Sequence, residues 1–293
     1  MILSVIYYLT ENDLTSASAV LRVWGPDANT YLQGQFTQDL RMADGTAAYG
    51  LWLDQKGKVL ADSHVLKLGD NHYMVVSFSM TAPQLLKRLE DYLIADEVEL
   101  RDETAQWTGI LLWGEGAGQQ QPPSDGLALP SRRAGLAGTQ WLVPVERSTA
   151  AGLEKNSAIM SDRPAVELAR LRAGVPTVPL DIGPRDLPNE GGLEEVAVSY
   201  TKGCYLGQDV MGRLKNLGQV RRRLHLVQGP GFPPESGSAL YQGERKMGET
   251  RSAAVDGKDF LGLAMISLVN LDLETGLSLT PGAEPSVQIL RRV

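Results

Sequence analysis

The residues best suited to take part in a reaction lie together between positions 202 and 209, where the sequence reads Lys-Gly-Cys-Tyr-Leu-Gly-Gln-Asp. Cys204 is the single cysteine of the chain. The thiolate is the form of cysteine that attacks electrophiles and binds metals, and a neighbouring cation or helix N-terminus favours it. Lys202 is close by, and we expect a short helix to follow. The segment therefore predicts a thiol that attacks an electrophile, binds a metal or senses oxidants. A buried cysteine that serves as a small apolar side chain is the alternative.

Two glycines flank this cysteine. Gly203 and Gly207 would let the backbone turn sharply or approach a ligand closely, because glycine has no Cβ to clash. A turn that serves only the fold is the alternative for each of them. The three histidines, His64, His72 and His225, show no metal-ligand spacing, so the sequence predicts no metal site.

One basic run, Arg221-Arg222-Arg223, stands out near the start of the C-terminal region. Alternate side chains of a strand point to opposite faces, so the run need not form a patch, and we favour a solvated strand over an RNA contact. The net charge of −7 also argues against binding nucleic acid through overall charge. We therefore expect no direct binding of nucleic acid.

Hydrophobic periodicity and turn residues indicate a mixture of strands and helices. A β meander is expected over residues 46–78 and an amphipathic helix over 81–94. Residues 114–138 are expected to be a long surface loop, and a helix capped by Ser161 or Asp162 should end at Gly174. Further strands are predicted at residues 19–24, 98–101, 108–113, 141–145, 219–227, 261–266 and 286–289. The pattern is that of an α+β chain with a small C-terminal β domain.

Length and composition set the class of protein. A chain of 293 residues is long enough for about two domains and a sizeable core. A single cysteine cannot form an internal disulfide. The start of the chain lacks the basic flank of a signal peptide, and no apolar run reaches the roughly 20 residues needed to cross a bilayer. We expect a cytoplasmic protein without a membrane partner.

Four segments, in the right order along the chain, resemble those of one known family. Lys202-Gly-Cys-Tyr-Leu-Gly-Gln-Asp209 is similar to the signature of YgfZ-type proteins, which are related to the glycine-cleavage T-protein; Asp209 replaces the family's usual glutamate. Residues 32–39 (Leu-Gln-Gly-Gln-Phe-Thr-Gln-Asp) resemble an early family segment, and residues 53–60 look like its hairpin. Residues 170–176 resemble the helix end that precedes a folate-contacting loop.

The resemblance implies the T-protein fold, in which three small α+β and β domains surround a central channel. Residues 1–46 together with 149–215 would form a discontinuous folate-binding domain. Residues 47–148 would form a second, α+β domain. Residues 216–293 would form a C-terminal, β-barrel-like domain.

The resemblance also implies a function. The chain would bind tetrahydrofolate, or a folate with a one-carbon substituent, and support the assembly or repair of iron–sulfur clusters. Its partners would be folate and iron–sulfur client proteins, including iron–sulfur enzymes of tRNA modification. Any reaction would use Cys204, with Lys202, as its catalytic residues.

The implied folate contacts come from two segments. Glu190, next to Asn189, is expected to accept hydrogen bonds from the adjacent N–H donors of the pterin edge, with Glu194 and Glu195 as nearby alternatives. Lys202 and Arg213 are expected to pair with the glutamyl tail. The remaining folate-contacting residues predicted in this way are Gly203, Tyr205, Gly207, Gln208 and Asp209.

Two enzymatic alternatives remain open. The first is aminomethyl transfer to tetrahydrofolate, as in the T-protein itself. T-proteins carry a motif similar to Asp-Phe-x-Gly where this chain has Cys204-Tyr-Leu-Gly207. They also carry paired aspartates where this chain has Ala61-Asp62. Both departures put the aminomethyl-transfer reaction in doubt. A one-carbon transferase that uses Cys204 as its nucleophile is a variant of this alternative. The second is a cysteine hydrolase, for which His225 is the nearest histidine in sequence.

Overall fold

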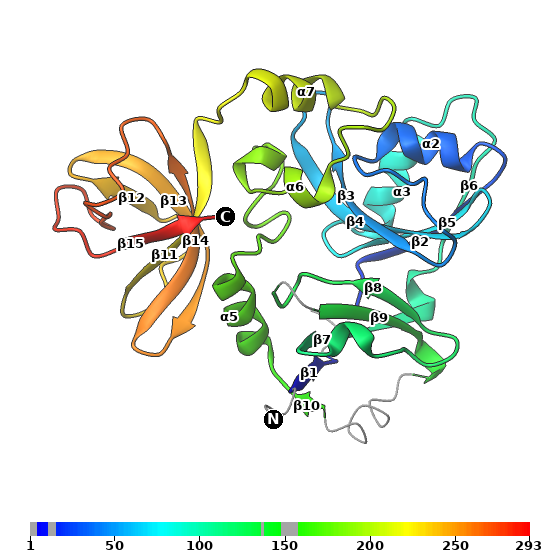
Figure 1. Cartoon of the computed structure of the whole chain (residues 1–293), viewed down its shortest axis with the longest axis horizontal. Coiled ribbons are helices and arrows are strands. Elements are labelled where there is room, and N and C mark those ends of the chain that lie inside the picture. The colour runs from blue at the N-terminus through cyan, green and yellow to red at the C-terminus, as the bar shows by residue number, and fades with distance from the viewer. Residues whose placement is uncertain (1–4, 11–15, 136–137, 148–157) are drawn as a thin grey trace.

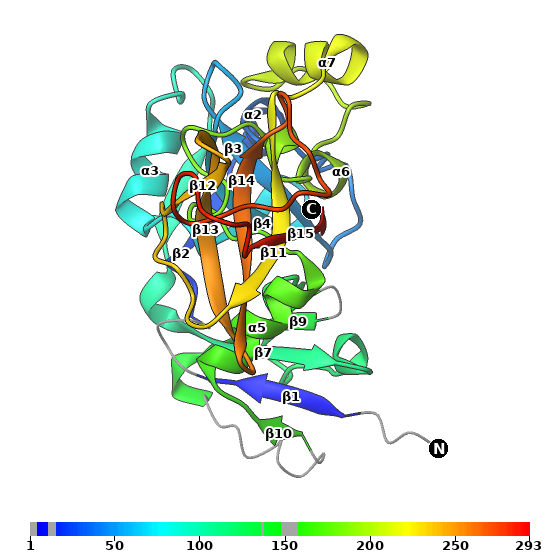
Figure 2. The ribbon, with the colours of Figure 1, turned by 90° about the vertical axis from the view of Figure 1, so that its left-hand side faces the viewer.

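The fold consists of three five-stranded sheets around a central segment that carries most of the helices (Figures 1 and 2). The computed structural model describes residues 5–10, 16–135, 138–147 and 158–293. In Figure 1 the C-terminal sheet lies on one side of the molecule and the other two sheets lie on the opposite side. Helices α5 (Arg163–Ala173) and α6 (Glu194–Ala197) lie between them. The α+β class predicted from the sequence is confirmed.

The first sheet contains the predicted meander and two strands that flank it in sequence. In sheet order its strands are β3 (Ala47–Leu53), β4 (Val59–Gly69), β5 (His72–Ser77), β2 (Ala19–Trp24) and β6 (Glu99–Asp102). Helices α2 (Ala28–Gln35) and α3 (Ala82–Glu90) supply apolar residues to its core, where Trp52 and Phe36 are fully buried. Thr81 and Gln84 form a capping box that starts α3 where the sequence predicted a helix.

The second sheet joins strands from three distant parts of the chain. Its order is β10 (Ile159–Met160), β1 (Ile6–Leu9), β7 (Trp107–Gly114), β9 (Gly138–Pro144) and β8 (Leu127–Pro130). The prediction that residues 114–138 form a loop is wrong in part, because β8 forms inside this segment and pairs with β9. Strand β8 has too few alternating apolar residues to be recognised, and the prolines and glycines around it are typical of a loop. Short 3₁₀ turns complete this half of the chain at Thr104–Gln106, Ala117–Gln119 and Val145–Arg147.

The third sheet is formed by the C-terminal residues. Its order is β12 (Ala239–Gln242), β13 (Arg245–Asp256), β14 (Asp259–Ser267), β11 (Arg222–Pro230) and β15 (Gln288–Arg292). The five strands do not close into a continuous barrel. Isolated bridges from Tyr241 to Ser278 and from Leu277 to Val287 nevertheless connect its two edges, which gives the barrel-like form that was expected.

The sheets cut across the domain ranges predicted from the sequence. Strand β2 lies in the first predicted range and pairs along its whole length with β5 of the second. Strand β7, of the second range, pairs with β1 of the first. The division of the chain into domains therefore stays a prediction. None of the helices in the described part of the chain has the length and apolar character needed to cross a bilayer.

A buried ion pair fixes the central segment to the C-terminal sheet. Helix α5 begins at the predicted cap, where Asp162 accepts a hydrogen bond from the Ala165 N–H, and ends at Gly174, which adopts a positive φ of 70°. One turn before its end, the Arg170 guanidinium pairs with Asp181 at 2.8 Å, and both side chains are almost fully buried.

The same pair reaches the third sheet through Ser252. The Ser252 hydroxyl on β13 donates to Asp181 and accepts from Arg170. Arg170 also donates to the Val175 carbonyl, and the Thr177 N–H donates to Asp181. This network therefore joins α5, the 175–178 loop and β13 into one unit.

Replacing Asp181 with asparagine should destabilise the protein strongly. The change removes the fully buried counter-charge of Arg170 and leaves only the partly exposed Glu167 as its acidic partner, and breaking a buried pair typically costs about 3–5 kcal/mol of unfolding free energy. Equilibrium unfolding in urea measures this loss. The matched control is Asp256→Asn, because Asp256 pairs with the largely exposed Arg172 and such a pair contributes about 1 kcal/mol or less. Equal losses in the two variants would contradict the structural role given to Asp181.

Candidate functional site

The cysteine segment packs directly on the early segment at residues 32–39. The Lys202 ammonium donates to the backbone carbonyls of Phe36 and Gln38, at 2.7 and 2.9 Å. The Leu206 N–H donates to the Gly34 carbonyl. The two segments that carried most of the family resemblance are therefore one structural unit, although more than 160 residues separate them.

Lys202 acts as the anchor of this unit. Its side chain is buried, and burial lowers the pKa of its ammonium to about 8. Cys204, in contrast, is exposed, and among the described residues its thiol has no hydrogen-bond partner. Lys202 was expected to favour the thiolate form of Cys204. No contact between the two side chains is described, because the Lys202 ammonium donates to the carbonyls of Phe36 and Gln38 instead.

Gly207 is required by the same packing, whereas Gly203 is not. Gly207 caps helix α7 (Gln208–Leu217) with a φ of 85°, in the left-handed region that favours glycine. A Cβ there would lie 2.8 Å from the Asp54 carbonyl oxygen and 3.2 Å from the Gly57 Cα, in the hairpin at residues 53–60. At Gly203 a Cβ would meet no atom within 4 Å. A third segment of the resemblance thus joins the unit that carries Cys204.

The other residues predicted in this segment differ in their surroundings. Tyr205 is buried with its ring 5.5 Å from the Lys202 ammonium, while Asp209 and Arg213 are exposed on α7 and Gln208 is half-buried.

Glu190 accepts three hydrogen bonds inside the protein. It lies in the 3₁₀ turn Pro188–Glu190, and its carboxylate accepts from the Leu187 N–H and from two nitrogens of Arg222. Arg222 also pairs with Asp186, which in turn contacts Arg251. This second buried network ties the 186–190 segment to the C-terminal sheet. The role of Glu190 as the acceptor for a pterin stays a prediction.

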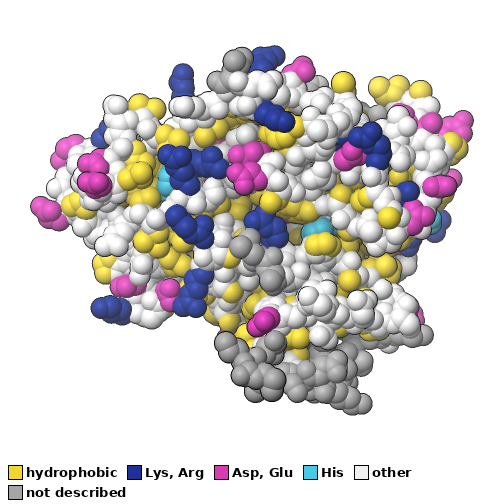
Figure 3. Space-filling model, in the orientation of Figure 1, with side chains coloured by type: hydrophobic (Ala, Val, Ile, Leu, Met, Phe, Trp, Pro, Cys, Tyr) yellow, Lys and Arg dark blue, Asp and Glu magenta, His cyan; other side chains and the backbone are white. Residues whose placement is uncertain are grey.

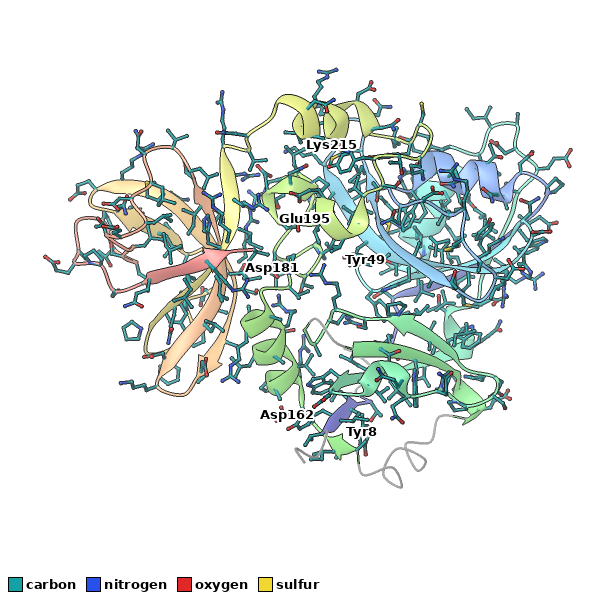
Figure 4. All side chains as sticks on the ribbon, in the orientation of Figure 1. Tyr8, Tyr49, Asp162, Asp181, Glu195 and Lys215 are labelled. Atoms are coloured by element: carbon teal, nitrogen blue, oxygen red, sulfur yellow. The ribbon has the colours of Figure 1, made fainter. Side chains whose placement is uncertain are left out.

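Asn189, next to Glu190, faces a different neighbour. Its amide hydrogen-bonds the Tyr200 hydroxyl, and its Oδ1 atom is buried without a partner among the described residues. Glu194 lies 3.7 Å from Arg223, and Glu195 is exposed on α6 (Figure 4).

A cavity of about 190 Å³ lies where the first two sheets meet the central segment. Figure 4 shows Tyr49 of β3 near this junction. The cavity combines apolar walls with several ionisable side chains. The apolar and aromatic walls come from Tyr49, Phe78, Pro130, Val175, Val178 and Val196.

Asp62 is the central acceptor of this first cavity. Its carboxylate accepts hydrogen bonds from the hydroxyls of Ser79 and Tyr49. Burial raises the pKa of Asp62, while these two hydrogen bonds and the charge of Arg133 oppose the rise. The sequence had pointed to this residue only as the partner of Ala61 in a position where the T-protein carries paired aspartates.

Two basic side chains line the same cavity as Asp62. Burial lowers the pKa of Arg133 to about 10, and its guanidinium lies 4.2 Å from the centre of the Phe78 ring. Burial also lowers the pKa of His64 to about 4, so this histidine is neutral at pH 7. The cavity thus offers a carboxylate, a neutral imidazole and a guanidinium around an apolar centre.

A second cavity of about 240 Å³ adjoins the first and is rich in arginine. Arg132, Pro176 and Val196 line both cavities. Arg223 of β11 and Arg291 of β15 line the second one, with Glu195 as the acidic residue on its wall. Lys and Arg side chains gather on the same face of the molecule, near its middle (Figure 3).

The three arginines are held to different degrees. Arg223 donates to the Val293 carbonyl, and Arg291 donates to the Arg172 carbonyl at the end of α5. The Arg132 guanidinium has no hydrogen-bond or ion-pair partner within the described ranges, although the backbone carbonyl of this residue accepts from the Gly135 N–H. Positive charge at the junction of the two cavities is therefore available to an anion.

The residues predicted from the sequence and the residues that line the cavities are different sets. None of the predicted folate contacts lines either cavity, although Glu195, noted as an alternative to Glu190, lines the second. The segment at residues 170–176, the fourth part of the resemblance, does line them through Arg170, Val175 and Pro176. The pair Arg132-Arg133, inside the segment predicted to be a loop, gave a further signal that the sequence analysis missed.

Alanine at Gly207 should disturb the cysteine segment, whereas alanine at Gly203 should not. Gly207→Ala forces a Cβ into the 53–60 hairpin and a strained backbone conformation, with an expected loss of about 1–3 kcal/mol of unfolding free energy. Equilibrium unfolding measures the loss, and the rate of Cys204 modification by a thiol reagent reports the local disturbance. Gly203→Ala is the matched control and should stay within about 0.5 kcal/mol of the wild type. A larger loss in the Gly203 variant would contradict the packing described.

Comparison with known proteins gives concordant matches along the chain. The model of the GCVT N-terminal domain family matches residues 12–119. The tRNA-modifying protein YgfZ of Escherichia coli O157:H7 is 28% identical over 283 residues, which cover 87% of this chain and 84% of that protein. An uncharacterized protein of Haemophilus influenzae is 29% identical over 214 residues, covering 71% of this chain and 70% of its own.

Among solved structures, aminomethyltransferase T of the glycine cleavage system from Bartonella henselae superposes with a TM-score of 0.79. The superposition covers 98% of this chain and 85% of that one, at 18% sequence identity, and so establishes the fold alone. The T-protein fold predicted from the sequence is confirmed. The chain is therefore similar in sequence to tRNA-modifying YgfZ proteins over most of its length, contains a match to the GCVT N-terminal domain, and shares the fold of aminomethyltransferase T.

Proposed function

We propose that the protein binds tetrahydrofolate, or a one-carbon derivative of it, across the two adjoining cavities. The observation that carries this proposal is that a largely apolar cavity with a buried carboxylate adjoins an arginine-lined one, and the two share Arg132, Pro176 and Val196. A reduced folate has a flat, polar-edged head, an apolar middle and a tail of carboxylates. Its three parts correspond to the first cavity, the shared wall and the arginine-lined cavity.

The first cavity suits the head because it combines burial with a few placed polar groups, the usual composition of a small-molecule site. Asp62 accepts from ring N–H donors, and the Tyr49 and Phe78 rings supply flat apolar surface. In the second cavity, Arg132, Arg223 and Arg291 would hold the tail through charge-assisted hydrogen bonds. This proposal moves the pterin contact from Glu190 to Asp62, and the tail contact from Lys202 and Arg213 to these three arginines.

The cysteine segment serves a separate purpose in this proposal. Cys204 lines neither cavity and is presented at the surface by a loop that Lys202 and Gly207 hold in place. A surface thiol is suited to contact with another protein. We infer that Cys204 meets the clients of the protein, in keeping with a role in the assembly or repair of iron–sulfur clusters.

The similarity to proteins described as tRNA-modifying supports clients that act in tRNA modification. The net charge of −7 favours protein clients over direct contact with tRNA. We propose that the protein acts in the cytoplasm, in keeping with this role.

Aminomethyl transfer to folate is the second candidate. Asp62, buried in the first cavity near the position of the T-protein's paired aspartates, favours it, as does the shared fold. A transferase that uses Cys204 as its nucleophile is disfavoured, because the thiol lies outside both cavities. A hydrolase that pairs Cys204 with His225 has no geometric support either, since His225 is buried in β11 and bonded to the Arg223 carbonyl.

Calorimetric titration with tetrahydrofolate tests the proposal. The wild type should bind saturably, and Arg132→Met should raise Kd about tenfold, the loss expected for one charge-assisted hydrogen bond. Arg213→Gln, which removes an exposed arginine outside both cavities, is the matched control and should leave Kd within about twofold.

Cys204→Ala should also bind like the wild type, because its thiol lines neither cavity. Absence of binding by the wild type would contradict the folate proposal. A larger effect of Arg213→Gln than of Arg132→Met would contradict the placement of the tail.

A further inference from the structure

Strand β15 forms one edge of the C-terminal sheet, and its outer side is open. Its inner side pairs with β11. On the outer side, Val287 and Leu277 exchange two backbone hydrogen bonds just before the strand begins. The chain that could continue this pairing turns away at Gly276, which has a positive φ of 74°. Among the described residues, no strand pairs with the outer side of residues 288–292, which we call the open edge.

The backbone of Arg292 faces outward at this open edge. The Val293 N–H donates to the Leu224 carbonyl of β11, and Arg292, the preceding residue, lies opposite His225. Neighbouring residues of an antiparallel strand direct their N–H and C=O groups to opposite sides, so those of Arg292 point away from β11. The side chains of Leu290 and Arg292 are exposed. The open edge is therefore accessible and has backbone groups free to pair with an added strand.

Arginine side chains surround the open edge. Arg292 and Arg221 are exposed, and neither has a carboxylate partner within the described ranges. Burial lowers the pKa of His225, and the nearby charges of Arg292 and Arg223 lower it further. Within the same ranges, Glu194 is the one carboxylate that lies within ion-pair distance of these three arginines, at 3.7 Å from Arg223. The open edge therefore carries an excess of positive charge.

These two properties together select the kind of partner. A second copy of this strand would bring Arg291 and Arg292 against the same residues, and like charges on neighbouring strands are destabilising. A nucleic acid would match the charge but has no peptide backbone to pair with the strand. An extended acidic peptide satisfies both requirements, because its main chain pairs with the edge and its carboxylates pair with the arginines.

We propose that the open edge of β15 is a docking site for an extended acidic segment of a partner protein, which joins the C-terminal sheet as a further strand. The carboxylates of this segment pair with Arg292 and Arg221, and Leu290 contributes an exposed apolar contact. The site goes beyond the proposed function, because these three residues line neither cavity.

The test uses the wild-type protein and a fluorescein-labelled peptide of four Glu-Thr repeats, followed by fluorescence anisotropy at low ionic strength. The acidic peptide should bind saturably and more weakly as salt is added, whereas a peptide of four Lys-Thr repeats should not bind. Two further acidic peptides are methylated on the backbone nitrogens of only the glutamates or only the threonines. One of them should bind at least about tenfold more weakly than the other, because a strand uses alternate N–H groups to pair with one neighbour.

Hydrogen–deuterium exchange of the wild type locates the bound peptide. The amides of residues 288–292 should become protected when the acidic peptide binds. The internal control is β12, the opposite edge of the same sheet, whose exchange should not change. Because this measurement needs no substitution, the proposal stays testable if a variant folds poorly.

A pair of matched variants tests the charge. Arg292→Gln should raise Kd for the acidic peptide about fivefold, the effect of one exposed ion pair. Arg245→Gln is the control, because Arg245 is also exposed and has no carboxylate partner within the described ranges, yet belongs to β13 at the far side of the sheet. This variant should leave Kd within about twofold.

Several results would overturn the proposal. Absence of saturable binding, protection confined to other residues, or equal effects of the two variants would remove the site. Equal binding by the two methylated peptides would show attraction between charges without strand addition. Protection of the open edge that rises with protein concentration in the absence of peptide would assign it to a second copy. Protection by a single-stranded oligouridylate but not by the acidic peptide would assign it to nucleic acid.

Discussion

The buried charge of Asp181 is the constraint on which the rest of the structure depends. An ionised carboxylate without exposure to water must be matched by cations and donors, because its desolvation is costly. Here the partners come from three places in the chain: Arg170 of α5, the backbone of Thr177, and Ser252 of β13. They can meet only if α5, the 175–178 loop and the C-terminal sheet adopt one arrangement. That loop supplies the wall of the first cavity, and its Pro176 is shared with the second.

A second network of buried ion pairs lies a few residues later in the chain. Asp186 and Glu190 share Arg222 of β11, and Asp186 also contacts Arg251 of β13. The two networks hold the segment at residues 181–190 between the C-terminal sheet and the remaining sheets. The position of the arginine-lined cavity follows, because Arg223 and Arg291 come from that sheet while Arg132 comes from the opposite side. Ion pairs thus fix the site in place, while apolar packing stabilises each sheet.

The exposed thiol and the two cavities are separate regions of the molecule. The first cavity combines buried polar groups with apolar walls, and the second is lined by arginines. The Cys204 loop is exposed, and the hydrogen bond from Lys202 to the Phe36 carbonyl holds it against the rest of the protein. This arrangement fits the proposal that the cavities hold a ligand and that the Cys204 loop is a separate surface for client proteins.

Local features of the fold could be predicted from the sequence because local rules determine them. Strand β2 occupies the predicted residues 19–24, and α5 begins after Asp162 and ends at Gly174, since a cap and a left-handed glycine are short-range signals. The resemblance also identified the segments around Gly34 and Cys204, which the structure brings together.

The cavity residues could not be found in this way. Asp62, His64, Arg132 and Arg223 come from segments that meet only through long-range pairing of strands. The pairing of Glu190 with Arg222 was missed for the same reason, because no local signal connects the basic run at residues 221–223 with Glu190. A carboxylate in a loop looks free until its tertiary partners are known.

A crystal structure of the protein with tetrahydrofolate bound tests the central claim most directly. The account predicts density for the pterin between Asp62 and Phe78, with the tail carboxylates against Arg132 and Arg223. Cys204 should remain outside the ligand's reach. Density for the ligand at the cysteine loop, or a pterin bonded to Glu190 with the Arg222 pair broken, would contradict it.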